Sequence, residues 1–247
     1  MTTETEAARK RALWLLLAVA LSLALSMTPW GKYVLYPFKL FTTWVHESGH
    51  ALAAILVGGD VVSMSIEPNT EGLTRSRLPS SILARAVVSS AGYMGASIFG
   101  CILLAATRLH RFSHAIIYAL GVAMLLSVVI WMRNLFGIGV VILLGGALVL
   151  MGRHVRGPVS HFILTFLGVQ VALNALFDIR VLFHLEEGTH SDAANMEKLL
   201  LISETFWAGL WMLASVLMVV ATLWLTREKE LPSERSRPRP RLAPSEN

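Results

Sequence analysis

The sequence predicts an all-α polytopic membrane protein with six or seven transmembrane helices and a short β hairpin. Hydrophobic residues make up 55% of the 247 residues and charged residues only 15%, whereas soluble domains carry about 25% charged residues. The apolar residues gather in long runs, several of which reach the roughly 20 residues needed to cross a bilayer. These runs cover residues 12–27, 41–57, 81–106, 115–131, 135–151, 159–177 and 206–225.

The amino-terminal flank, residues 1–11, is polar and ends in Arg9-Lys10-Arg11, directly before the first apolar run. Basic residues beside a membrane segment favour the cytoplasmic side. A cleaved signal peptide ending near Ala24-Leu25-Ser26 is the alternative, but an uncleaved anchor is favoured because the chain returns to the membrane directly. We therefore expect an integral protein of a bacterial plasma membrane with a cytoplasmic amino terminus.

The second apolar run carries His46-Glu47-Ser48-Gly49-His50, an HExxH motif. Residues four apart lie on one face of a helix, about 6 Å along its axis, so the two imidazoles can bind one metal ion. Glu47 then lies beside the ion and can accept a proton from a bound water. Burying His-Glu-His in an apolar segment costs several kcal/mol unless a partner such as a metal satisfies it. The motif predicts a catalytic metal site.

The segment after Gly58-Gly59 predicts a short β hairpin. Residues 62–67 alternate apolar and polar side chains, and Pro68-Asn69-Thr70-Glu71-Gly72 is a turn sequence. An exposed strand edge beside the metal site could bind an extended peptide by strand addition. A plain connecting loop is the alternative.

Small residues recur at every fourth position in the run 81–106, at Gly92, Ala96 and Gly100. Such a face lets another helix approach closely. We expect this face to mediate helix packing, and we expect Gly92 to leave room next to the metal site.

The runs 115–131 and 135–151 are divided by Arg133-Asn134 and predict a helical hairpin. His110 and His114 form a second pair four residues apart. No carboxylate is near them in the sequence, and arginines accompany them at an expected membrane boundary. We interpret this pair as boundary residues and not as a second metal site.

A polar stripe of Gln170, Asn174 and Asp178 recurs at helical spacing in otherwise apolar sequence. Three polar groups on one face do not face lipid. They form either a hydrogen-bonded contact between helices or a metal site, in which Asp178 is the third ligand and Asn174 and Gln170 orient it. Asp192 is the alternative ligand, although it follows an expected N-cap, Ser191, in a polar segment that we expect to be exposed. We favour Asp178.

The chain divides into a basic flank, a membrane-embedded domain and a polar tail, at residues 1–11, 12–226 and 227–247. The tail is rich in Arg, Pro, Ser and Glu, a composition typical of disorder. The single Cys101 excludes a disulfide framework and a cysteine-based zinc site. The charge of +5 suits orientation in a bilayer, and without an aromatic-interleaved basic face we expect no nucleic-acid partner.

Taken together, these elements resemble the M50 family of membrane-embedded zinc metalloproteases, the site-2 protease group, and most closely its M50B-like branch. The resemblance implies zinc bound by His46, His50 and an Asp, with Glu47 activating water to attack peptide bonds of membrane-anchored protein substrates. In this family the third ligand usually lies in an Asn-x-x-Pro run ending in Asp-Gly, whereas Asp178 is followed by Ile179 and no Pro precedes it. The matching segments are His46–Leu52, Gly58-Gly59, Ala91–Gly95, Asn174–Asp178 and Ser191–Ala193.

A non-catalytic membrane protein of the same fold, which binds or carries a metal or serves as a scaffold, is the second hypothesis. A carrier needs no base beside its ligands, so the intact Glu47 favours the protease. Two imidazoles and a carboxylate with one open position also suit a catalytic zinc ion on chemical grounds alone.

Overall fold

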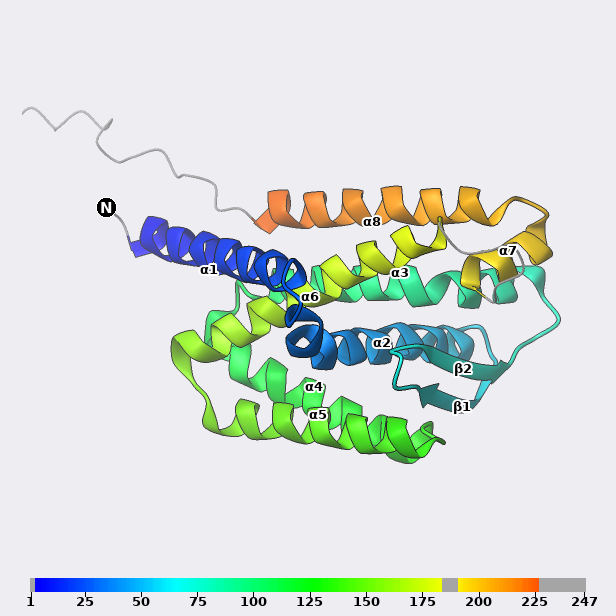
Figure 1. The fold of residues 1–247 in the computed structure, drawn as a ribbon, viewed down its shortest axis with the longest axis horizontal. Coiled ribbons are helices and arrows are strands. Elements are labelled where there is room, and N and C mark those ends of the chain that lie inside the picture. The colour runs from blue at the N-terminus through cyan, green and yellow to red at the C-terminus, as the bar shows by residue number, and fades with distance from the viewer. Residues whose placement is uncertain (1–2, 184–190, 227–247) are drawn as a thin grey trace, which may run out of the picture.

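The structure, a computed structural model, describes residues 3–183 and 191–226, and in them the chain is a bundle of helices with one β hairpin at its side (Figure 1). The elements are α1 (Thr3–Ser26), α2 (Gly31–Leu56), β1 (Asp60–Ile66), β2 (Gly72–Arg77), α3 (Ile82–Ala106), the 3-10 turn η1 (His110–Phe112), α4 (Ser113–Ile130), α5 (Leu135–His154), α6 (Gly157–Leu182), α7 (Asp192–Leu200) and α8 (Glu204–Thr226). The predicted disordered tail, 227–247, lies outside the described residues.

Five helices in the described ranges, namely α3, α4 together with η1, α5, α6 and α8, are long and apolar enough to cross a membrane. The apolar part of α1, Ala12–Ser26, is shorter, and α2 carries the polar HExxH motif. The all-α polytopic class is therefore confirmed. The number of six or seven crossings stays a prediction, because it requires α1, α2 or both in addition to these five helices. Figure 1 shows that α1 begins and α8 ends at the same end of the bundle, which fits six crossings and not seven.

Helix α3 lies at the centre of the bundle and packs against α2, α6, α7 and α8. A Cβ added at Gly100 would lie 3.0–3.3 Å from Ala172 of α6, and one added at Gly49 would overlap the carbonyl oxygen of Ala91. The small residues of α3 therefore mediate close helix packing, as the sequence predicted. The same packing explains why the fourth residue of the HExxH motif is a glycine.

The predicted β hairpin is present, with β1 and β2 antiparallel. The middle of β1 also bonds to the connector between α4 and α5, where the amide of Met64 donates to the carbonyl of Trp131 at 2.7 Å. The side chain of Asn134 extends this pairing, since its Nδ2 donates to the carbonyl of Ile66 at 2.7 Å. Both edges of β1 are therefore occupied, and the outer edge of β2 pairs with no other strand in the described ranges.

Helix α7 begins as the sequence predicted, because the Ser191 hydroxyl accepts a hydrogen bond from the amide of Ala194 at 3.0 Å. It folds back against α3 and α8, and Ala193 and Met196 are buried in a cluster with Trp211. This packing brings the first turn of α7 over the HExxH helix.

Candidate metal centre

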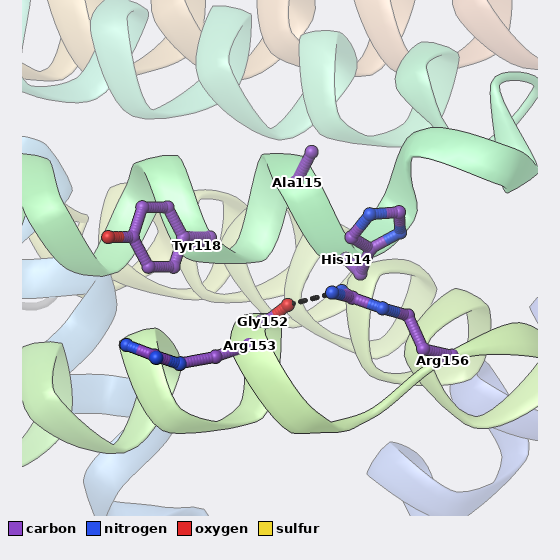
Figure 2. A pocket seen from close by; sticks show the side chains of 6 residues that line it. All are labelled: His114, Ala115, Tyr118, Gly152, Arg153 and Arg156. Atoms are coloured by element: carbon purple, nitrogen blue, oxygen red, sulfur yellow. Dashed lines mark hydrogen bonds between the residues drawn. The ribbon is translucent and has the colours of Figure 1, made fainter.

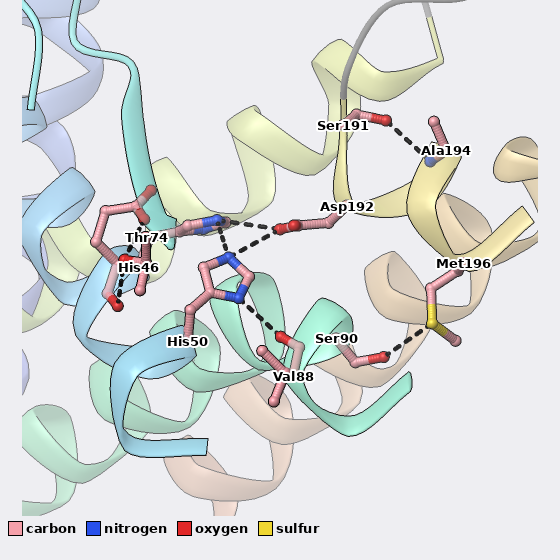
Figure 3. Close-up of polar contacts among 10 residues, drawn as sticks. His46, His50, Thr74, Val88, Ser90, Ser191, Asp192, Ala194 and Met196 are labelled. Atoms are coloured by element: carbon pink, nitrogen blue, oxygen red, sulfur yellow. Dashed lines mark hydrogen bonds and ion pairs between the residues drawn. The ribbon is translucent and has the colours of Figure 1, made fainter. Parts of the chain in front are cut away.

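Three side chains converge where the start of α7 meets α2 (Figure 3). The Nε2 atoms of His46 and His50 lie 3.1 Å apart, and Oδ2 of Asp192 lies 3.2 Å from each of them. This is the one group of three or more His, Cys, Asp or Glu residues with converging ligand atoms in the described part of the chain. The spacing of the histidines on α2 is the one that the motif predicts.

The geometry of this triangle fits a tetrahedral zinc ion. With bonds of 2.0–2.1 Å, neighbouring ligand atoms lie about 3.3 Å apart. Nδ1 of His50 is 2.7 Å from the carbonyl oxygen of Val88 and can only donate to it, so the neutral form of His50, the form that binds a metal, carries its lone pair on Nε2. In neutral His50 this lone pair and the Asp192 carboxylate then point at the same spot. A cation at that spot would satisfy both.

The position of Asp192 differs from the exposed one that the polar sequence suggested. Its side chain is only 16% exposed, because α7 folds onto α3 and α8. Burial alone would raise the pKa of Asp192, but the imidazoles of His50 and His46 hold it below its usual value. The carboxylate is therefore ionised, as a metal ligand must be.

None of the three side chains in the polar stripe of α6 is among the converging ligand atoms. Asp178 lies 3.9 Å from Lys39, and Asn174 donates to the hydroxyl of Thr42 at 3.2 Å. Gln170 donates to Ser22 of α1 at 3.2 Å. The stripe joins α6 to α1 and to the part of α2 before the motif. It therefore forms the contact between helices that the sequence offered as the alternative to a metal site. Asp192 therefore replaces Asp178 as the candidate third ligand.

Glu47 is buried and held by the β hairpin. Its Oε2 accepts a 2.6 Å hydrogen bond from the hydroxyl of Thr74. Gly72, two residues earlier on the same face of β2, lies so close that an added Cβ would meet the Glu47 carboxyl group. The hairpin thus fixes the carboxylate of the candidate base next to the two histidines on the same helix.

Gly92 leaves room for the two imidazoles. A Cβ added to it would overlap the Nε2 atoms of both His46 and His50. Any larger residue would push the two ligand atoms apart or occupy the space where a metal would be bound. The next residue, Tyr93, meets the His46 ring edge to face at 4.7 Å and stacks on Trp211 of α8 at 5.4 Å.

We expect Gly92→Ala to reduce the amount of bound metal by at least about tenfold. Displacing two of the three candidate ligands should weaken metal binding at least as much as the loss of one hydrogen bond that orients a ligand. The measurement is zinc per protein by elemental analysis after purification. Gly95→Ala is the matched control, since its Cβ would approach only the Cα of Gly49, at 3.3 Å. Equal zinc loss in both variants would assign the effect to helix packing.

Three contacts of the site were not predicted from the sequence. They are the hydrogen bond from Thr74 to Glu47, the hydrogen bond from His50 to the Val88 carbonyl, and the stacking of Trp211 on Tyr93. Because side chains alternate along β2, Thr74 lies on the same face of the strand as Gly72. The sequence does not show that this face turns toward α2, because that depends on how the hairpin folds onto the helix. The Val88 carbonyl belongs to a helix backbone and has no sequence signal.

The sequence model of the Peptidase M50B-like family matches residues 14–222. Among curated proteins and among solved structures no match was found. The matched range contains the HExxH helix, the hairpin, the small-residue helix α3 and Asp192, so it includes every side chain of the site. The chain belongs to the Peptidase M50B-like family.

Proposed function

We propose that this protein is an intramembrane zinc metalloprotease that hydrolyses peptide bonds of membrane-anchored protein substrates. The observation that carries the proposal is the convergence of His46, His50 and Asp192 next to the buried carboxylate of Glu47. It lies among apolar helices of a chain that belongs to a peptidase family. A membrane-embedded site can act on polypeptides that enter the bilayer.

The chain's own residues divide into ligands and a base. His46, His50 and Asp192 would hold the metal, and this donor set favours zinc. When bound, zinc would polarise a peptide carbonyl and make a water molecule more acidic. Glu47 would accept the proton of that water and pass it to the leaving amine, while Thr74 keeps its carboxylate in place.

The outer edge of β2 supports the binding of an extended substrate. Its backbone groups are not paired with another strand in the described ranges, and its neighbouring face carries Thr74, which contacts Glu47. A peptide added to this edge would run beside the site with its backbone hydrogen-bonded. We propose this edge as the substrate-binding surface.

The test is cleavage of a membrane-anchored reporter by purified wild-type protein and by Glu47→Gln, with zinc measured in both. A non-catalytic carrier or scaffold would bind zinc without cleaving in either form. The Glu47→Gln variant also serves as a trap, because a substrate that binds without being cleaved can be isolated and identified.

We expect Thr74→Val to lower kcat by about 10- to 100-fold with little change in KM. Valine keeps the shape of threonine but removes the hydroxyl that orients Glu47, and loss of one oriented hydrogen bond to a catalytic group has effects of this size. The measurement is a full kinetic profile on the reporter, with zinc content determined in parallel.

Thr74→Ser is the matched control because it keeps the hydroxyl and loses only the methyl group. It should restore most of kcat. If serine were as impaired as valine, or if valine cleaved normally, the hydroxyl would have no positioning role.

A further inference from the structure

A cavity of about 350 Å³ opens between α4 and α5, at the opposite ends of these helices from the connector that contacts β1. It is lined by His114, Ala115, Tyr118, Gly152, Arg153 and Arg156. Figure 2 shows the two arginines and His114 around the space between the helices. The metal centre uses none of these residues.

The lining is positively charged without an acidic counterpart. No Asp or Glu occurs between residues 72 and 177, and neither Arg153 nor Arg156 forms an ion pair within the described ranges. The start of α4, which forms one wall, has no side-chain N-cap, so its first amides add partial positive charge. The cavity therefore suits an anion.

The walls of the cavity are held in place by close packing. A Cβ added at Gly152 would lie 2.5–2.7 Å from the backbone and Cβ of Tyr118, so α4 and α5 are in contact at its floor. Arg156 donates from Nη1 to the carbonyl of Gly152 at 2.7 Å, which leaves its other guanidinium nitrogens available. A planar guanidinium held in this way suits the oxygens of a phosphate.

The surroundings distinguish a lipid from a soluble anion. Leu150, one turn before Arg153 on α5, is 60% exposed, and Leu143, two turns earlier, is 69% exposed. These apolar side chains continue from the cavity along the surface of a membrane-spanning helix. The start of α4 and the end of α5, which line the cavity, lie at the end of the bundle where α1 begins (Figure 1). We expect this end to be cytoplasmic, the side where anionic lipids are enriched.

We propose that the cavity formed by His114, Tyr118, Arg153 and Arg156 binds the phosphate headgroup of an anionic phospholipid, with the acyl chains lying against Leu150 and Leu143. Basic pockets between transmembrane helices on the cytoplasmic side bind such headgroups in other membrane proteins.

The experiment is native mass spectrometry of the full chain in detergent, with added phosphatidylglycerol or phosphatidylcholine of the same acyl chains. We expect the wild type to retain phosphatidylglycerol preferentially, and Arg153→Gln to weaken this binding about fivefold while phosphatidylcholine binding is unchanged. Arg153 makes no hydrogen bond or ion pair in the described part of the chain, so this variant should fold, which its melting temperature checks.

Arg108→Gln is the matched control, because it also removes one positive charge. Arg108 lies between α3 and η1 and does not line the cavity. It should leave phosphatidylglycerol binding within about twofold of the wild type. Equal losses in both variants would show a diffuse basic surface and overturn the proposal. Displacement of the lipid by millimolar inorganic phosphate would equally overturn it, since the cavity would then bind a soluble anion.

Discussion

Glu47→Gln is expected to reduce peptide-bond cleavage by about 10²- to 10⁴-fold, the usual contribution of a general base, while zinc content stays at the wild-type level. Glutamine has the same shape as glutamate and can keep a hydrogen bond with Thr74, but its amide cannot accept the proton of a water molecule. Glu47 is not among the converging ligand atoms, so its replacement removes the base and leaves the metal ligands in place.

Cleavage of the membrane-anchored reporter and zinc per protein should be measured on the same preparation. Glu71→Gln is the matched control, because it makes the same chemical change at an exposed residue of the hairpin turn. This control should cleave at the wild-type rate. A clean Glu47→Gln preparation that cleaved as fast as the wild type would rule out the proposed mechanism, and zinc loss in Glu47→Gln would make Glu47 a ligand.

Asp192→Ala is expected to lose most of its bound zinc and nearly all cleavage together. Its carboxylate supplies one of the three atoms that converge at 3.1–3.2 Å, and two imidazoles alone leave zinc with half of its usual four ligands. The measurement is zinc content, with cleavage as the second readout. In contrast, Asp178→Ala should retain zinc, because Asp178 is not among the converging ligand atoms and its partly exposed side chain lies 3.9 Å from Lys39.

A separate control tests whether zinc loss in Asp192→Ala results only from unfolding of α7. Ser191→Ala removes the N-cap of that helix, which typically costs about 1 kcal/mol, without removing a ligand atom. Zinc should remain in this variant. Zinc loss in Asp178→Ala with retention in Asp192→Ala would transfer the ligand role to Asp178, and equal loss in Ser191→Ala and Asp192→Ala would indicate a structural effect.

Features set by local periodicity could be predicted from the sequence alone. Helical spacing places His46 and His50 on one face, and an HExxH motif in an apolar run has few explanations other than a metal. Alternation and a turn sequence predicted the hairpin, the hydroxyl of Ser191 predicted where α7 begins, and the spacing of Gly92 and Gly100 predicted close packing. Each of these follows from the backbone geometry of a single element.

Only the tertiary structure brings Asp192, and not Asp178, together with the two histidines. Helical periodicity shows that Gln170, Asn174 and Asp178 share a face, but it does not show which helix that face meets, and it meets α1 and the early part of α2. Asp192 looked exposed because its neighbours in sequence are polar. It is half-buried because α7 packs its apolar side onto α3 and α8. This packing brings the Asp192 carboxylate to His46, which lies 146 residues earlier in the chain.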